Sequence, residues 1–515
     1  MRIFLITICV AVIQCLAFAQ GFKTRHYVAN ASQNSSKALF ESTLNNYVGL
    51  GFAVDTSGNV ARNQIVLTGL NSNGEVQWVK KHHGGAIEYL ENGFIQRCFY
   101  KSGNYLYFAG CAQDSDAASG RMFGIFLKYN LNGDTVWRRT FKSSDPLEDV
   151  VPQMVTKSTD GGFLMTGFFQ HWGNNTNPCL LIKTDSEGNE LWRKKIGKGS
   201  PNVCDGKAIV QDSLSKKIAI VGYQYVGSSN DIYDHILITD SVGNKKYQGN
   251  FCTIGGMATD LIQSNDGKIL MVGWQFYSEK IGGTNTARSF ACKFDINDPA
   301  SPVWKINGFD RQAIYNGFTS AVELGNSDIL IGGFIDTTIG VLNKPPSNLA
   351  PNHLTRLTII DTTGNIKWNR YYNYKTNDNL TQNYQGLRSL NLSNSGSWLA
   401  AIEGFNYPAS NPLFFVKYDS TGCDSSLAYC ALVNSGVEEF QVSGSGFRVY
   451  PNPVNDELYI QHSDGHSENT ELIITDVNGK ETKKEMLDPE GKINTSDLSP
   501  GIYFLQIKQN KELVY

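Results

Sequence analysis

The sequence predicts an all-β protein in which seven copies of a four-stranded unit form a ring and a small β-sandwich follows. Two short motifs that recur in phase along most of the chain predict the ring, and a change in sequence character near residue 434 predicts the second module. The composition agrees, because 50 glycines and 11% aromatic residues are typical of short strands joined by tight turns. These features argue against a helical bundle.

The first motif places an aromatic residue four positions after a turn glycine. Its five regular copies are Gly74 with Trp78, Gly133 with Trp137, Gly188 with Trp192, Gly243 with Tyr247, and Gly364 with Trp368. Trp304 fills the slot in a sixth copy with a remodelled turn, and Ser426 occupies it in a seventh. A regular spacing of this kind is the signature of a repeat architecture.

The second motif is an apolar run that ends in glycine, and it also occurs seven times. The glycines are Gly51, Gly110, Gly167, Gly222, Gly273, Gly333 and Gly404. In one complete unit we expect strands over residues 150–157, 162–167, 179–184 and 190–195, separated by turn residues. A repeated antiparallel meander of four strands is typical of a propeller blade, so residues 20–433 are expected to form a seven-bladed β-propeller.

The repeated glycines and tryptophans are interpreted as structural, with glycine serving the turns and tryptophan packing between blades. The segments from Asp185 to Trp192 and from Asp361 to Trp368 resemble the tryptophan-docking motif of quinoprotein-like and WD40-like propeller repeats. This resemblance covers the scaffold only, and it transfers no cofactor ligands, so no cofactor is expected. A subsidiary expectation is that Thr24 to Val28 pairs with the last blade and closes the ring.

The first 19 residues have the pattern of a cleaved secretory signal. Arg2 is followed by an apolar run to Leu16 and by the Ala-Phe-Ala site at 17–19. The alternative, a membrane anchor, requires about 20 apolar residues, which is more than this run supplies. We therefore expect a mature chain that begins at Gln20 and has no transmembrane segment.

Residues 434–447 are rich in serine and glycine and are expected to be a linker, with a separate module at 448–515. The module's short apolar strands, separated by Asn-Gly and Pro-Gly turns, predict a small Ig-like β-sandwich. Its diagnostic residues are Tyr450, Pro451, Asn452, Pro453, Gly479, Gly501 and Tyr503. In this order they resemble the type A C-terminal sorting domain of the type IX (Por) secretion system.

That resemblance implies export through the periplasm to the outer cell surface or the medium. It also implies two partners, the outer-membrane translocon and the sorting peptidase. Nucleic acid is not expected as a partner, because 45 basic and 48 acidic residues leave no positive excess to neutralise phosphates.

The sequence has no recognisable catalytic or metal-binding motif. P-loop, G-x-S-x-G and H-E-x-x-H patterns are absent, and the eight histidines lack metal-ligand spacing. Acidic turns such as residues 265–267 could hold calcium, but a hairpin turn explains them better, and no metal is predicted. Cys423 and Cys430 flank a short loop and are a candidate disulfide, whereas Cys179 and Cys292 are interpreted as buried thiols.

Function is expected in the loops after the second strand of each blade, which emerge on one face of the ring. Trp172, Tyr225, Tyr277 and Tyr407 are the candidate ligand-binding residues there. For aromatic residues directly after the glycine of the second motif, such as Trp274, the alternative interpretation is that they pack between blades.

These loops favour a non-enzymatic binding protein for a glycan or protein ligand. The alternative is a propeller glycan hydrolase or lyase, whose carboxylates would converge from several blades and leave no local motif. Asp205 and Asp260, expected just before the first strands of their blades, are the candidates for such a pair.

Overall fold

The computed structural model describes residues 21–424 and 447–513, apart from several loop segments. The undescribed segments within these ranges are 58–61, 83–86, 90–96, 114–120, 173–176, 198–202, 227–230, 251–255, 282–283, 308–315, 337–352, 373, 375–383, 406–411, 451–456, 463–469, 477–479, 487–490, 499–502 and 510–511. The expected signal peptide and almost all of the expected linker lie outside the described residues.

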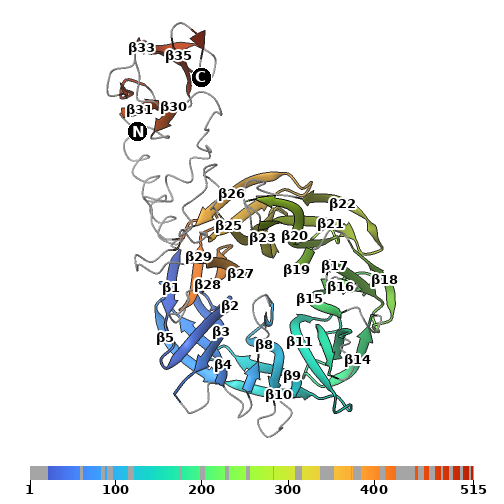
Figure 1. Ribbon diagram of the computed structural model, residues 1–515. Coiled ribbons are helices and arrows are strands. Elements are labelled where there is room, and N and C mark those ends of the chain that lie inside the picture. Colours follow the sequence, from blue (N-terminus) through green and yellow to red (C-terminus); the bar gives the residue numbers. More distant parts are fainter. Residues whose placement is uncertain are drawn as a thin grey trace. The chain divides into compact units, whose positions relative to one another are not determined.

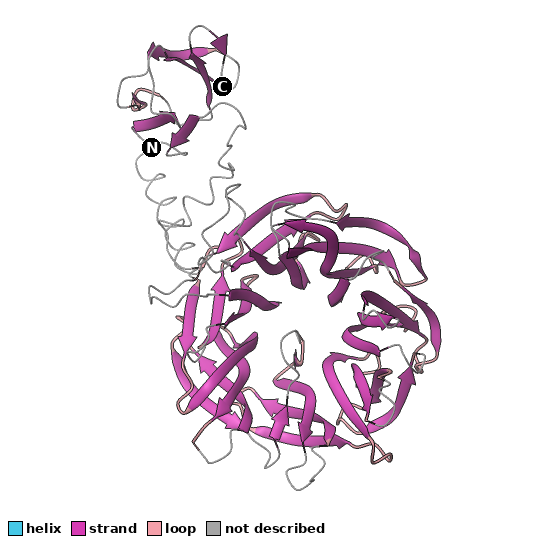
Figure 2. Ribbon diagram, viewed as in Figure 1, coloured by secondary structure: helices cyan, strands magenta, loops and turns pink. Residues whose placement is uncertain are grey.

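Seven antiparallel sheets form a closed ring, as Figure 1 shows. The described residues form strands and turns and contain no helix (Figure 2). The prediction of an all-β chain with a seven-bladed propeller is therefore confirmed.

Blades 1 to 3 contain three sets of strands in chain order. They are β2 (Ala31–Thr43), β3 (Asn46–Asp55), β4 (Arg62–Leu70) and β5 (Val76–His82); β6 (Ile87–Tyr89), β7 (Phe99–Ser102), β8 (Tyr105–Gln113), β9 (Met122–Asn130) and β10 (Thr135–Phe141); and β11 (Glu148–Lys157), β12 (Phe163–His171), β13 (Cys179–Thr184) and β14 (Glu190–Ile196). In blade 2 the innermost strand is divided, because both β6 and β7 pair with β8.

Blades 4 to 6 repeat the four-stranded pattern. Their strands are β15 (Val203–Gln211), β16 (Ile218–Val226), β17 (Asp231–Thr239) and β18 (Lys245–Gly249); β19 (Gly256–Gln263), β20 (Ile269–Ile281), β21 (Thr284–Asp295) and β22 (Asp298–Asn307); and β23 (Asn316–Glu323), β24 (Ile329–Asp336), β25 (His353–Ile360) and β26 (Ile366–Tyr372).

Blade 7 is assembled from the two ends of the propeller sequence. It contains β27 (Tyr384–Leu392), β28 (Trp398–Phe405) and β29 (Leu413–Tyr418), and its outermost strand is β1 (Phe22–His26). β1 pairs antiparallel with β29, with Phe22 opposite Lys417 and His26 opposite Leu413. Closure by the N-terminal segment is confirmed, although the strand begins and ends two residues earlier than expected.

The innermost strand of most blades contains a bulge, and this bulge explains the glycine of the second motif. In blade 4 the pairing of β15 with β16 shifts between Gly206 and Ala208, opposite Gly222. A Cβ atom at Gly222 would clash with the carbonyl oxygen of Asp205, so only glycine allows the strands to approach there. Gly167 meets the carbonyl of Val151 in the same way.

Four of the tryptophans of the first motif pack on the turn glycine of the following blade. A Cβ atom at Gly133 would lie 2.8 Å from Trp78, and one at Gly188 would lie 2.5 Å from Trp137. Each glycine has a positive φ, which completes the tight turn. The structural interpretation of this motif is confirmed.

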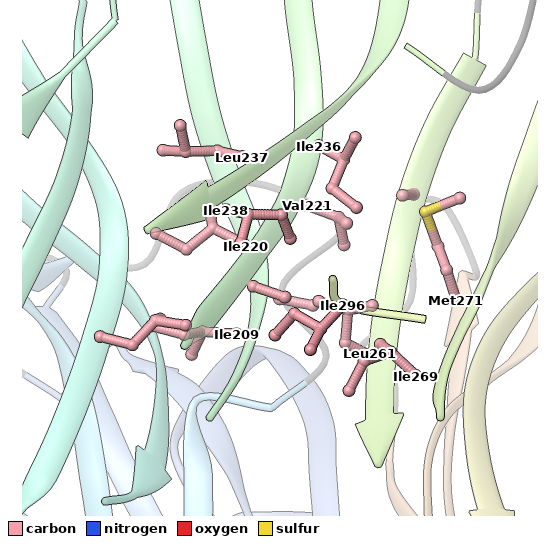
Figure 3. Packing of buried hydrophobic residues seen from close by; sticks show 14 of the residues in the cluster. Ile209, Ile220, Val221, Ile236, Leu237, Ile238, Leu261, Ile269, Met271 and Ile296 are labelled. Carbon is pink, nitrogen blue, oxygen red and sulfur yellow. The ribbon is translucent and has the colours of Figure 1, made fainter. Parts of the chain in front are cut away.

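Apolar side chains of neighbouring blades interdigitate and hold the ring together. Figure 3 shows one such cluster, in which Ile209, Ile220 and Ile238 of blade 4 pack near Leu261 and Met271 of blade 5. All five are at most 2% exposed. Removal of this much apolar surface from water is the main favourable term in the folding of the ring.

The C-terminal unit contains two sheets of its own. One sheet contains β30 (Phe447–Tyr450), β31 (Glu457–His462) and β34 (Lys492–Asn494), and the other contains β33 (Glu481–Met486), β32 (Thr470–Asp476), β35 (Tyr503–Gln509) and β36 (Glu512–Leu513). Leu458 and Ile460 of the first sheet share a core with Leu472 and Ile474 of the second. The Ig-like topology stays a prediction.

Candidate functional site

Of the four predicted ligand-binding aromatics, Trp172 is the one whose side chain the structure describes. It directly follows β12, and its side chain is 53% exposed. Tyr225 and Tyr277 lie inside β16 and β20, opposite Ile232 and Thr286, so they extend hairpins rather than occupy loops. Tyr407 lies outside the described residues.

Trp172 is held in one orientation by a buried carboxylate. Its indole Nε1–H donates to Asp149 Oδ2 at 2.8 Å, and its backbone N–H donates to the carbonyl of Leu147 at 3.0 Å. Asp149 is fully buried in β11, and its Oδ1 also accepts the N–H of Met122 at 3.1 Å. A buried carboxylate with several donors is a rigid anchor, since breaking any of these bonds would leave charge unsatisfied.

Arg121, which directly precedes β9 in the preceding blade, completes this arrangement. Its guanidinium carbon lies 5.5 Å from the centre of the Trp172 ring, and its Nη1 lies 3.9 Å from Asp149 Oδ1. We call Arg121, Asp149 and Trp172 the Trp172 platform. It presents a fixed aromatic surface and a partly exposed cation, which is chemistry suited to stacking and hydrogen bonding with a polar ring.

The two carboxylates considered for catalysis do not lie before the first strands. Asp205 lies within β15 and forms an ion pair with Lys207 at 2.8 Å. Asp260 lies within β19, fully buried, and forms an ion pair with Arg97 at 2.9 Å. Burial raises the pKa of Asp260, and Arg97 opposes that rise. The strands begin earlier than expected because their pairing extends beyond the apolar run.

Sequence reasoning missed a polar collar around the centre of the ring. It consists of the residues at or beside the bulges of the innermost strands, namely Lys37, Gln153, Lys207, Thr259, Thr319 and Arg388. All six are at most 6% exposed. A recurring spacing in the sequence could have identified these residues, because each lies 14 to 16 positions before the glycine of the second motif.

Collar residues connect neighbouring blades. Lys207 Nζ donates to Gln153 Oε1 at 3.0 Å, and Thr259 Oγ1 donates to the carbonyl of Phe318 at 2.9 Å. Thr319 Oγ1 donates to the carbonyl of Leu387 at 2.6 Å. These contacts satisfy the polar groups that the bulges bury, so the collar serves the ring's stability.

The cysteines follow the predictions in part. Cys292 is a buried thiol as expected, and burial raises its pKa to about 12. Cys179 is disulfide-bonded, which corrects the expectation of a thiol there. Cys423 is buried and Cys430 lies outside the described residues, so their pairing stays a prediction.

Within the described parts of the chain, no group of three or more His, Cys, Asp or Glu side chains could hold a metal ion. The described residues also include no helix that is long and apolar enough to cross a membrane. Trp274, considered as a loop aromatic, is 5% exposed and packs against Gly317 of the next blade. It therefore has a structural role.

Two residues of the sorting motif lie on strands, and the others lie outside the described residues. Tyr450 ends β30 opposite Tyr459, and Tyr503 begins β35 opposite Asp476. Pro451, Asn452, Pro453, Gly479 and Gly501 are in undescribed segments.

Comparison with protein families matches residues 448–515 to the secretion system C-terminal sorting domain. This region is a type IX sorting domain, which implies export to the medium or the outer surface. No curated protein matches the chain.

Solved structures that resemble the chain include three distant ones. The β-propeller domain of the trilobed protease from Pyrococcus furiosus is 9% identical, with a TM-score of 0.39 and coverage of 77% of this chain and 99% of that one. Hydrazine synthase from Kuenenia stuttgartiensis is 11% identical, with a TM-score of 0.39 and coverage of 61% and 78%. The acylaminoacyl peptidase from Pyrococcus horikoshii is 10% identical, with a TM-score of 0.41 and coverage of 84% and 58%.

Proposed function

We propose that this type IX-exported propeller protein is a non-enzymatic binding protein that recognises a glycan through the Trp172 platform. The observation that carries the proposal is an aromatic side chain that is half exposed yet fixed in orientation by a fully buried carboxylate. An exposed indole costs hydration free energy, and stacking against a sugar ring would recover part of it.

Pre-organisation supports binding at this place. Because Asp149 and the carbonyl of Leu147 already hold the indole and its backbone, little side-chain entropy remains to be lost when a ligand stacks on the ring. The Arg121 guanidinium beside the ring can donate hydrogen bonds to sugar hydroxyls. We favour a glycan over a protein partner because a protein interface needs a wide apolar patch, whereas the platform and its backbone partner contribute two exposed apolar side chains, Trp172 and Leu147.

The alternative of a glycan hydrolase or lyase has no comparable support among the described carboxylates. Asp149 is engaged by two donors, and Asp205 and Asp260 are paired with Lys207 and Arg97. A general acid or a nucleophile must be able to reach its substrate.

The test is a carbohydrate array probed with the mature full-length protein and two variants. Trp172→Ala should abolish binding, whereas Tyr371→Ala should leave it unchanged, since Tyr371 is 41% exposed on the outer strand β26. Binding that is equal in both variants would remove the platform from the proposal. Turnover of a bound polysaccharide would replace it with the enzymatic alternative.

We further propose that the translocon recognises residues 448–515, that the sorting peptidase removes them, and that a signal peptide ending at Ala19 is cleaved first. The masses of the periplasmic and surface forms test both cleavages. A surface form that retains residues 448–515 would contradict the peptidase step.

A further inference from the structure

The centre of the ring contains a cavity of about 380 Å³. It lies among the C-terminal ends of the innermost strands. Thr156 of β11 and Leu392 of β27 are part of its wall. The Trp172 platform lies at the opposite end of β11, since His171 pairs with Glu148 and the strand runs on to Lys157. The cavity and the platform are therefore separate features.

Blade 2 provides the unusual part of the cavity wall. Because its innermost strand is divided, Arg97 and β7 form a segment of their own that contributes Arg97, Phe99, Tyr100 and Lys101 to the lining. Arg97 reaches across the ring, where it donates to the carbonyl of Ala321 in blade 6 at 2.6 Å. Its ion pair with Asp260 of blade 5 fixes the guanidinium at the cavity.

The charged lining of the cavity is positive. Arg97 and Lys101 line it, and the lining residues include no carboxylate. Asp260 balances the charge of Arg97, whereas among the described residues no carboxylate lies within ion-pair distance of Lys101. Lys101 is thus a cation of the cavity that has no counter-charge among the described residues.

A buried hydroxyl in the lining also lacks a partner. Ser389 is 3% exposed, and its Oγ has no hydrogen-bond partner among the described residues. Ser320 occupies the same position after the bulge of blade 6, and there the Oγ accepts the N–H of Leu390 at 3.1 Å. A buried hydroxyl left unsatisfied costs free energy that a bound polar group would recover.

The rest of the lining combines apolar side chains with the polar residues Thr156, Gln263 and Asn391. Phe40, Phe99, Leu261, Ile262 and Leu390 contribute to it. The volume is within the range of pockets that enclose small molecules, and such pockets combine apolar walls with a few placed polar groups.

We propose that this cavity binds one small organic anion, a molecule with an acid group and an apolar body. Lys101 and the Arg97 guanidinium attract the acid group, and the Ser389 hydroxyl donates to an oxygen of the ligand. The apolar body packs against Phe99 and the aliphatic wall. This site is independent of the glycan proposed at Trp172.

Two fluorescent probes that differ in one group test the proposal. 8-Anilinonaphthalene-1-sulfonate has an apolar body with a sulfonate, and N-phenyl-1-naphthylamine is the same body without it. We expect the mature full-length protein to bind the sulfonate with a stoichiometry of one and more tightly than the uncharged probe. Equal affinity for the two probes, or binding of neither, would overturn the proposal.

Four variants locate the site. Lys101→Gln should weaken sulfonate binding by about fivefold and leave the uncharged probe unaffected, since a partly exposed charge pair contributes modestly. Lys246→Gln, on the outer strand β18, is its control and should bind as the wild type does. Leu392→Trp fills the rim of the cavity, where the side chain is already 36% exposed, and should block both probes.

Leu191→Trp is the matched control for Leu392→Trp, because Leu191 is 57% exposed on the outermost strand β14 and does not line the cavity. Thermal unfolding of each variant verifies that it is folded. Sulfonate binding that is unaffected by both Lys101→Gln and Leu392→Trp would place the probe elsewhere and would contradict the site.

Discussion

The seams between blades within the repeat differ from the seam that closes the ring. At the seam between blades 2 and 3, Trp137 of β10 packs on Gly188, and both blades are continuous in the sequence. At the closing seam between blades 7 and 1, Phe22 of β1 packs on Gly74, and Thr24 Oγ1 donates to the carbonyl of Gly74 at 2.5 Å. The same docking position is filled at the closing seam by a residue from the beginning of the chain.

This difference explains why the seventh copy of the aromatic motif has Ser426 in place of an aromatic residue. The fourth strand of blade 7 does not follow Gly422, because β1 takes that place in the sheet. The aromatic residue needed there is Phe22. The docking position at the closing seam is therefore filled although the seventh slot of the sequence motif has no aromatic residue.

The closing seam also contains a buried ion cluster. Glu403 of β28 is 6% exposed, accepts the hydroxyl of Ser35 at 2.6 Å, and pairs with Lys37 of β2 at 3.5 Å and with Arg388. Burial alone would raise the pKa of Glu403, but Arg388 and Lys37 hold it below its ordinary value. The seam between blades 1 and 2 instead has an exposed pair between Lys80 and Asp134.

Removal of β1 should have the largest effect on stability, because β1 closes the ring. A mature chain that starts at Tyr27 should lose at least about 5 kcal/mol of unfolding free energy, because truncation of a buried Phe alone costs about 3–5 kcal/mol. Chemical denaturation followed by circular dichroism measures the loss. If the shortened chain kept the wild-type midpoint, β1 would not be the closure of the ring.

Loss of Glu403 should be the next largest effect. Glu403→Gln leaves Lys37 and Arg388 buried without a counter-charge, and breaking a buried pair costs about 3–5 kcal/mol. Asp134→Asn at the ordinary seam is the control, and it should have a much smaller effect because that pair is exposed. If the two variants had similar midpoints of unfolding in urea, the stability of the closing seam would not depend on its ion cluster.

Acid should weaken an ordinary blade through His235 of blade 4. Burial, with a smaller contribution from Lys245, lowers the pKa of His235 to about 4 in the folded protein. In the unfolded chain the pKa is about 6.5, so protons bind preferentially to the unfolded state as the pH falls from about 6.5 to about 4. About 3 kcal/mol of stability should be lost over that interval.

His235→Gln removes this titration, so its unfolding free energy should change less between pH 7 and pH 4 than that of the wild type. Denaturation curves at several pH values provide the comparison. Parallel pH profiles for the two proteins would contradict the lowered pKa.

The smallest effect should be the same within the repeat and near the closing seam. Asp185 Oδ1 accepts the N–H groups of Glu187 and Asn189, and Asn71 Oδ1 near the closing seam accepts those of Asn73 and Glu75. Asp185→Ala and Asn71→Ala should each cost about 1 kcal/mol, the usual value for such turn hydrogen bonds. Thermal unfolding measures both losses. Widely different melting temperatures of the two variants would show that the two turns do not contribute equally to stability.

The sequence predicted the repeat, the number of blades and the export module because those signals are local. A strand is predicted from its own alternation of apolar and polar residues and from the turn that ends it. The motif that ends at Trp192 recurs with the same spacing at Trp368. Trp172 could also be predicted, since a large aromatic residue in a polar loop is recognisable from the local sequence alone.

Which distant residues come into contact depends on the fold and could not be predicted from the sequence. Arg97 and Asp260 form an ion pair across the ring although 163 positions separate them, and Phe22 completes a blade whose other strands lie almost four hundred residues later. Tyr225 and Tyr277 lie in strands and not in the predicted loops. How far the two strands of a hairpin stay paired depends on contacts between them, which the local sequence does not show. Local propensity acts along the chain, whereas ring closure and strand pairing act through contacts between distant residues, and that is why the sequence determined the blades and the fold determined the sites.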